Sequence, residues 1–414
     1  MKRDLQLLSV GFAVRTFGAA IYSPFLALFL FSIMHVGYLE IGVIFVGLGA
    51  LQLPFGLLGG LWTDRIGRRR LIVLSLITEA AFTALLAYAF QIQSLGLGIA
   101  TAGIAGCILS ATGPAFSSYI ADWGTGSGRT LAFTWYRISF NAGFAAGVAI
   151  GGTLITFVGF PGAVAISAAI IGVAALFVLV LMHPSPYDLA LQEGKPWAPG
   201  GEPAPSKAHS MRESFSLLAT DRPALLTAFG FALVWLTANQ WNVTFSLFVH
   251  NKLGIPYDIL GIGLALNGLI VVVGQFTTTQ RVLGVRHTTI AILGGALYVV
   301  AYLLLGVAAL WMLIPVVIFL VSVTVLTIGE NLGSIPTSTL PSNLAPPGEV
   351  GAYNGIFGTF MGGSGLAAVF FGGVVLATVA NPLMEWVLLV LPAFPGFLLL
   401  KYAATRIPIE KDRA

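Results

Sequence analysis

Four charged side chains lie inside long apolar stretches of the sequence: Arg15, Glu79, Arg137 and Glu330. A charge at membrane depth is costly, so each is expected to face a water-filled cavity or an opposite charge. A carboxyl group that is dry in one conformation and wet in another changes its proton affinity, which couples proton binding to conformation. Glu330, the only carboxylate deep in the second half of the chain, is the predicted proton-coupling residue. An interhelical hydrogen bond is its alternative role.

Glu79 is the second candidate for proton coupling, although a structural pairing is the first expectation for it. Arg15, Glu79 and Arg137 lie at similar depths in stretches that start from the same side, so Glu79 can pair with either arginine. The remaining positive charge would suit an anionic substrate or adjust the acidity of a nearby carboxyl group. Asn141 lies one helical turn after Arg137 and shares its face.

Aromatic and amide side chains at helical spacing predict a substrate cavity. Trp235, Asn239 and Asn242 would share one helix face. They combine apolar surface with hydrogen-bonding tips, as sites for weakly polar ligands do. Trp and Tyr also anchor helices at membrane interfaces, which is the alternative explanation. The predicted cavity residues are Arg15, Tyr22, Arg137, Asn141, Trp235, Asn239, Asn242, Tyr353, Asn354 and Phe357.

The elements that position these residues must be membrane helices. Of the 414 residues, 57% are hydrophobic and 9% are charged, whereas soluble domains carry roughly 25% charged residues. A chain of this length cannot bury so much apolar surface in a water-soluble core. We therefore expect an all-α membrane protein with twelve transmembrane helices. Their expected ranges are 5–33, 40–62, 71–91, 95–121, 130–157, 161–182, 223–250, 258–281, 289–307, 311–342, 349–378 and 383–402.

The distribution of basic residues predicts the topology. If both termini are cytoplasmic, nearly all Lys and Arg residues outside the spans fall on the cytoplasmic side, and only Lys252 falls outside. This asymmetry is typical of multi-pass proteins, and a plasma (cell) membrane location is expected. Glu40 and Glu385 lie at the outer ends of helices, where solvation is expected.

The chain reads as two similar halves. Residues 183–222 are rich in Pro and charge and predict a cytoplasmic linker, with a short interfacial helix at 210–219. It separates six-helix bundles at 1–182 and 223–414. At nearly constant offset, Gly151-Gly152 corresponds to Gly372-Gly373, Asp122 to Asn343, Pro114 to Pro336, and Gly42 to Gly261. Two repeated halves indicate a transporter with its binding site between them.

The loop between the second and third spans carries the most specific motif. It reads Gly60-Leu-Trp-Thr-Asp64-Arg65-Ile-Gly67-Arg68-Arg69-Arg70. This resembles the G-x-x-x-D-R-x-G-R-R loop of the major facilitator superfamily. The resemblance implies a fold of two six-helix halves and a conformational latch in which Asp64 docks at the start of the eleventh helix. It also implies a charge relay through Asp122, paired with Arg68 or Arg69, and Arg129. The corresponding second-half loop, 281–287, lacks the Asp, so the latch is expected on one side only.

A glycine ladder in the fifth span consists of Gly143, Gly147 and Gly151-Gly152. It is similar to the antiporter motif of the drug:proton antiporter branch of that superfamily, except that Val148 stands where the motif has Pro. Close helix packing is the alternative explanation, because small residues let membrane helices approach.

The leading functional hypothesis is a secondary active transporter that moves a small solute by alternating access, with proton-coupled export of amphipathic, drug-like compounds. The alternative is an importer or exchanger of a small organic anion or sugar, and a non-transporting membrane sensor is a remote alternative. An enzyme is not expected, since no catalytic motif falls in the spans. We expect a monomer in the lipid bilayer whose partners are a small-molecule substrate and protons, without nucleic acid. We expect no cofactor and no metal: no His pair has ligand spacing, and Cys107 is the only cysteine.

Overall fold

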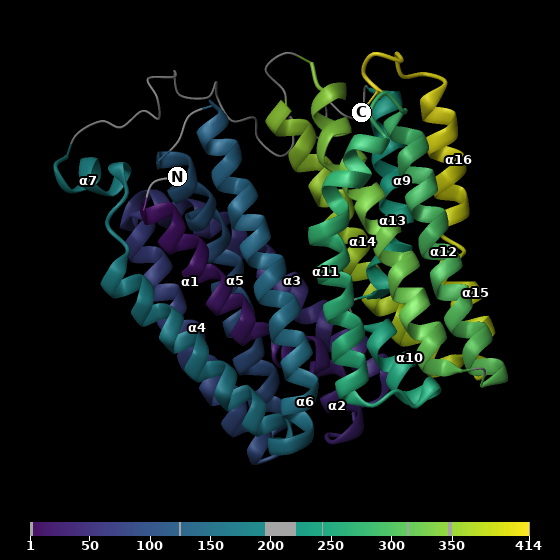
Figure 1. The fold of residues 1–414 in the computed structure, drawn as a ribbon, viewed down its shortest axis with the longest axis horizontal. Coiled ribbons are helices and arrows are strands. Elements are labelled where there is room, and N and C mark those ends of the chain that lie inside the picture. Colours follow the sequence, from purple (N-terminus) through teal and green to yellow (C-terminus); the bar gives the residue numbers. More distant parts are fainter. Residues whose placement is uncertain are drawn as a thin grey trace. The chain divides into compact units, whose positions relative to one another are not determined.

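The computed structural model describes residues 3–123, 126–194, 221–241, 243–312, 314–346 and 350–413. These residues are helical almost throughout, and an isolated bridge between Arg286 and Arg413 is their single β contact. The elements are α1 (Arg3–Ala20), η1 (Ser23–Phe25), α2 (Leu26–Ser32), α3 (Tyr38–Ile66), α4 (Arg68–Gln91), α5 (Leu95–Trp123), α6 (Gly126–Leu181), α7 (Pro186–Gln192), α9 (Arg222–Ala238), η3 (Asn239–Trp241), α10 (Thr244–Leu253), α11 (Tyr257–Arg281), α12 (His287–Trp311), α13 (Pro315–Leu344), α14 (Val350–Thr378), α15 (Pro382–Val390) and α16 (Ala393–Ala404) (Figure 1).

Eleven helices in the described part of the chain are long and apolar enough to cross a membrane. One of them covers two of the predicted spans. It is α6, which contains Gly159 in a non-helical conformation with φ 72° and ψ 167°, followed by Pro161. Within the apolar range Trp135–Leu181, the stretches on either side of Gly159 are each near the roughly 20 residues that one crossing needs. The predicted all-α membrane fold is confirmed, and the predicted count of twelve spans is approximately supported.

The first and seventh spans, each predicted as continuous, are broken near their middle. A 3-10 turn at Ser23–Phe25 separates α1 from α2, where Pro24 removes a backbone donor. In the second half of the chain, Asn239–Trp241 form a 3-10 turn between α9 and α10. The second break is supported from α14, because the Gln240 amide donates to the Ala368 carbonyl (3.2 Å) and the Thr244 hydroxyl donates to Gln240 Oε1 (2.7 Å).

The chain divides into two compact units. Unit 1 comprises Met1–His35, Gly47–Ala204 and Tyr257–Gly268, and unit 2 comprises Val36–Val46, Pro205–Pro256 and Leu269–Ala414. Each unit therefore includes a short piece of a helix that otherwise belongs to the other unit: the start of α11 in unit 1 and the start of α3 in unit 2.

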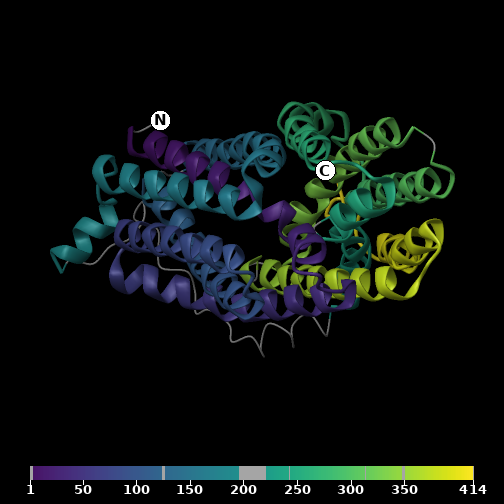
Figure 2. The same cartoon turned by 90° about the horizontal axis from the view of Figure 1, so that it is seen from below.

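Within unit 1, α1 runs beside α6 (Figures 1 and 2). The glycine ladder of α6 allows the two helices to approach each other closely. A Cβ atom at Gly143, Gly147 or Gly151 would overlap a backbone carbonyl oxygen of α1 or of the residue that follows it. The carbonyls belong to Ala13, Phe17 and Ile21, each one turn after the last. Van der Waals contact of this kind holds membrane helices together, since lipid offers no hydrophobic driving force between them.

The residues matched in the sequence repeat make equivalent contacts in the two units. In unit 2, a Cβ atom at Gly42 would lie 3.2 Å from the Val369 carbonyl oxygen, and Gly373 faces Gly42. In unit 1, a Cβ atom at Gly261 would lie 2.7 Å from the Val148 carbonyl oxygen, and Gly152 faces the start of α11. The repeat is thus a structural one at these four glycines.

Candidate functional site

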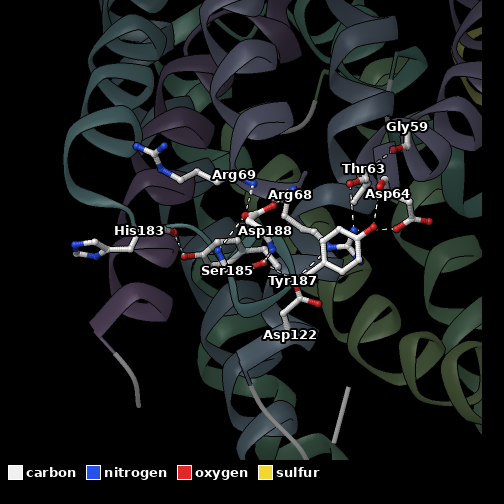
Figure 3. A network of polar contacts seen from close by, with 11 residues as sticks. Gly59, Thr63, Asp64, Arg68, Arg69, Asp122, His183, Ser185, Tyr187 and Asp188 are labelled. Atoms are coloured by element: carbon white, nitrogen blue, oxygen red, sulfur yellow. Dashed lines mark hydrogen bonds and ion pairs between the residues drawn. The ribbon is translucent and has the colours of Figure 1, made fainter. Parts of the chain in front are cut away.

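The signature loop is the centre of a polar network at one end of unit 1 (Figure 3). The Arg68 side chain, 9% exposed, donates from Nη1 to the Asp64 carboxylate (2.9 Å) and to the Thr63 carbonyl (3.1 Å). Its Nε lies 3.2 Å from Asp122 Oδ2. Asp64 remains 64% exposed. Arg68, rather than Arg69, is thus the ion-pair partner of Asp122.

Asp122 lies beyond the apolar part of α5, and its side chain is 3% exposed. It accepts a hydrogen bond from the Ser185 hydroxyl (2.6 Å). Burial raises the pKa of Asp122 above the ordinary carboxyl value, and the Ser185 hydroxyl and the Arg68 guanidinium only partly offset this.

The first residues of the predicted linker are folded onto the signature loop. The carboxylate of Asp188, on α7, accepts hydrogen bonds from the backbone N–H groups of Arg68 (2.6 Å) and Arg69 (3.1 Å). These are unpaired donors at the start of α4, where a negative charge also faces the positive end of the helix dipole. Gly67 makes room: its φ is +98°, and a Cβ atom there would lie 2.6 Å from Asp188 Oδ1.

Other linker side chains bind the neighbouring helix ends (Figure 3). The Tyr187 ring stacks on the Arg68 guanidinium at 3.3 Å, and its hydroxyl donates to the Asp64 carbonyl (2.7 Å). Arg69 donates to the carbonyls of Met182 (2.6 Å) and Leu179 (2.6 Å) at the end of α6.

Sequence reasoning missed Ser185, Tyr187 and Asp188. The signal was present, since Ser185 and Asp188 form a capping box with Pro186 at the first helical position. That pattern predicts a helix start but says nothing about where the Asp188 carboxylate docks.

In unit 2, the C-terminal segment makes an equivalent contact with the start of α12. Asp412, which is fully buried, accepts hydrogen bonds from the Thr288 N–H (2.9 Å) and hydroxyl (2.7 Å) and from Arg286 Nε (2.7 Å). In both units, an Asp that follows the last long helix binds the start of the third spanning helix, α4 or α12. The second-half loop lacks its own Asp, and Asp412 supplies a carboxylate there.

Arg15 and Glu79 form a buried ion pair inside unit 1. Arg15 Nε donates to Glu79 Oε2 (3.0 Å) and Nη2 donates to Oε1, so the contact is bidentate. The two side chains are 6% and 8% exposed. Tyr22, the nearby residue before η1, is half-buried. The pair leaves little of Arg15 for a substrate and engages both oxygens of Glu79.

Arg137 is exposed, and no carboxylate lies within ion-pair distance of it among the described residues. Asn141 donates its amide to the Arg137 backbone carbonyl (2.9 Å). Gly60 has open space beside it, and Arg65 is exposed. Asn242 and the Arg129 side chain lie outside the described residues.

A cavity of about 180 Å³ in unit 2 brings together three of the predicted residues: Trp235, Asn239 and Glu330. Its remaining lining residues are Ala238, Trp241, Tyr298 and Leu326. Glu330 is the one carboxylate among these lining residues and is partly buried. Asn239 donates its amide to the Trp235 carbonyl (2.8 Å).

The predicted cavity residues of the eleventh span lie elsewhere. Tyr353 and Phe357 are 2% and 1% exposed and belong to the hydrophobic core of unit 2. The Tyr353 hydroxyl donates to Asp221 (2.8 Å), and the Asn354 amide donates to the Ser342 hydroxyl (2.8 Å). Apolar residues are spread evenly around α14, so the sequence does not show which face of this helix points toward the cavity. The positions of these side chains could therefore not be assigned from the sequence.

Glu385 also differs from expectation. Glu40 is exposed, as expected at a helix end, and it accepts from the Gly37 N–H (2.9 Å). Glu385 is fully buried, and its Oε1 lies 3.2 Å from Lys252 Nζ. The expectation that Glu385 is solvated was wrong, because α15 packs against α12 and α14, and Lys252 of α10 pairs with Glu385.

Comparisons with known proteins agree with the fold. The model of the Major Facilitator Superfamily matches residues 8–369. The chain is 24% identical over 385 residues to the uncharacterized MFS-type transporter YttB of Bacillus subtilis (strain 168), which covers 91% of this chain and 89% of that protein. It is 30% identical over 283 residues to the class D tetracycline resistance protein of Salmonella ordonez, which covers 67% of each chain.

A crystal structure of an auto-inhibited POT family peptide transporter superposes with a TM-score of 0.77 at 16% identity, over 98% of each chain. At this identity the likeness shows the fold alone. The family match, in contrast, covers most of the sequence and includes the signature loop. The chain therefore belongs to the major facilitator superfamily of membrane transporters.

Proposed function

We propose that this transporter is a secondary active, proton-coupled exporter of amphipathic, drug-like compounds, with lipophilic cations as its test substrates. The observation that carries the proposal is the cavity in unit 2, where Glu330 lies among Trp235, Trp241 and Tyr298. Aromatic faces and one carboxylate suit an organic cation, which gains cation–π and ionic attraction in a partly dry site. The likeness to a protein named for tetracycline resistance supports the export of drug-like molecules.

Coupling follows from competition at one carboxylate. Ionised Glu330 attracts a cation, whereas protonated Glu330 does not, so the proton and the substrate occupy the site alternately. The cavity volume, about 180 Å³, is below the roughly 300 Å³ of a typical drug site. It can hold a ring or an ammonium group, and the rest of a larger substrate would extend beyond it.

An importer or exchanger of a small organic anion or sugar is the second candidate. Arg137 favours it, since this exposed arginine within a span has no ion-pair partner among the described residues. Arg15 does not, because Glu79 neutralises it. In the proposed exporter, Glu79 acts as the structural partner of Arg15 and not as a proton carrier.

The proposed working arrangement is alternating access between halves 1–182 and 223–414, joined by the linker 183–222. The protein would act as a monomer in the plasma membrane with both termini cytoplasmic. The loop of Asp64 and Arg68 would serve as the conformational latch, together with Asp122 and Arg129.

Binding of a lipophilic cation such as tetraphenylphosphonium to purified protein tests the proposal. Glu330→Gln should weaken binding about tenfold, or about 1.4 kcal/mol, and should abolish competition by protons. Arg137→Gln should leave cation binding unchanged. Loss of organic-anion binding in Arg137→Gln, with no cation binding in wild type, would favour the anion carrier instead.

A further inference from the structure

Unit 2 contains a second buried carboxylate that the proposed mechanism does not use. Glu385 lies in the first turn of α15 and pairs with Lys252 near the end of α10, at the end of unit 2 opposite the C-terminus (Figure 1). The Glu385 side chain is 0% exposed, and the Lys252 side chain is 29% exposed. The pair therefore joins a dry carboxylate to a cation that reaches solvent.

Hydrogen bonding at this site is incomplete. Neither oxygen of Glu385 accepts a well-formed hydrogen bond from a described residue, and the indole N–H of the adjacent Trp386 is also buried without an acceptor. Buried carboxylates in native proteins are normally surrounded by donors. Among the described residues, Lys252, at 3.2 Å, is the one cation within ion-pair distance of Glu385. A carboxylate with one removable counter-ion is suited to exchange that counter-ion for a proton.

The surroundings limit what else could control its charge. Lys252 faces Glu385 from α10 and Tyr38 faces the pair from α3, and the Tyr38 hydroxyl accepts from the Asn251 amide (3.3 Å). His250 is directed to the Ile255 carbonyl (2.7 Å). The other packed helices, α12 and α14, contain no Asp, Glu, Lys or Arg.

Aromatic side chains connect this pair to the Glu330 cavity. Trp386 stacks on Tyr302 at 4.5 Å and 9°, and Tyr302 lies 6.3 Å from Tyr298, which lines the cavity. A change in packing at Glu385 therefore has a short, fully packed route to the cavity wall.

We propose that Glu385 is a second proton-binding carboxylate, with Lys252 as its displaceable counter-ion; this rests on the proposed proton-coupled export. Without a proton, Glu385 is ionised and holds Lys252 against it. When a proton binds to a Glu385 oxygen, the neutral carboxyl group no longer needs the ammonium group, which returns to water. The proton arrives from the side where Lys252 is exposed, which is the outer side in the proposed topology.

The test compares two transport modes in proteoliposomes with a lipophilic cation. One is transport driven by a pH gradient, and the other is counterflow of labelled against unlabelled cation, which needs no net proton movement. Glu385→Gln and Lys252→Gln should both reduce gradient-driven transport by about tenfold or more, as expected when a proton-transfer group is removed, and should retain counterflow. Lys252→Arg, which keeps a positively charged counter-ion, should retain gradient-driven transport. Glu40→Gln, which removes an exposed carboxylate of unit 2, is the matched control.

A purely structural ion pair predicts a different pattern. Both single variants would then lose the two transport modes in parallel, and the double variant Lys252→Gln/Glu385→Gln would recover them; this result would overturn the inference. If Glu385→Gln does not fold, an infrared titration of wild type and Lys252→Gln decides. Lys252→Gln should show one protonated carboxyl band more than wild type at neutral pH, and equal bands would refute the inference. A wild type that ignores the pH gradient would overturn the proposed function itself.

Discussion

At the scale of single residues, the charges within the spans differ in their surroundings. Arg15 and Glu79 satisfy each other through two hydrogen bonds in a buried setting. Glu330 instead lies at a cavity, and Arg137 is exposed. Glu330 and Arg137 have opposite sign and belong to different units.

Removing one member of the Arg15–Glu79 pair should be strongly destabilising. Glu79→Met or Arg15→Met leaves a buried charge without a partner, which costs about 3–5 kcal/mol, whereas replacing both by apolar residues is often close to neutral. The thermal midpoints of the two single variants and the double variant in detergent measure this coupling. Arg137→Met is the control and should change the midpoint little. A double variant as unstable as either single one would contradict the account.

Asp122 should give the protein a specific pH dependence. Because its pKa is raised in the folded state, the folded protein holds more protons than the unfolded chain above the ordinary carboxyl pKa of about 4. The stabilising contribution of Asp122 is therefore present below the ordinary carboxyl pKa of about 4 and declines as the pH rises above it. Between pH of about 4 and about 7, the midpoint of wild type should fall relative to that of Asp122→Asn.

An Asp122→Asn curve that runs parallel to wild type across this pH range would show that the burial of Asp122 does not influence its proton binding.

At the scale of elements, the structure depends on how helix ends are satisfied. Asp188 and Asp412 each bind the start of a third spanning helix, α4 or α12, from a segment that follows the last long helix of its unit. The unpaired N–H groups of both helices are thereby satisfied, which helix termini require when they are not solvated. These contacts also fix the start of the helix that follows the signature loop at Arg68, and the start of its counterpart at Arg286.

Loss of either aspartate should loosen its own helix start. Asp188→Ala and Asp412→Ala should each reduce stability by about 0.5–2 kcal/mol, the usual effect of losing a cap. Hydrogen exchange should accelerate at the amides of Arg68 and Arg69 in the first variant and of Thr288 in the second. Glu410→Ala removes an exposed carboxylate of the same C-terminal segment and should do neither. Unchanged exchange at these amides would mean that the aspartates do not act as caps.

The elements show where sequence reasoning succeeds and where it stops. Long apolar runs predict the spans, because a membrane helix needs little more than length and hydropathy. The breaks after α1 and α9 could not be predicted with the same ease, since their unpaired groups are satisfied by contacts from distant helices such as Gln240 with Ala368. The site shows the same division. Trp235 and Asn239, predicted for the substrate cavity, line one cavity with Glu330, the predicted proton-coupling residue, while Tyr298 and Leu326 of the same cavity come from helix faces that the sequence leaves undetermined.

At the scale of the whole molecule, the chain is a multi-pass transporter of the major facilitator superfamily. Its two halves share a repeat that extends from matched glycines to broken first helices and to the paired aspartate caps. Their polar centres differ, however: unit 1 carries the Arg68 network and the Arg15–Glu79 pair, and unit 2 carries the Glu330 cavity and the Lys252–Glu385 pair. The proposed coupling therefore assigns proton chemistry to unit 2.

Proton flux driven by a lipophilic cation in proteoliposomes tests the assignment of Glu330 most directly. A pH gradient is imposed, a lipophilic cation is added, and the gradient is followed for wild type and Glu330→Gln. If Glu330 carries the proton, the cation should dissipate the gradient in wild type and leave it intact in Glu330→Gln. A gradient that the cation leaves intact in wild type, or dissipates equally in both proteins, would contradict it.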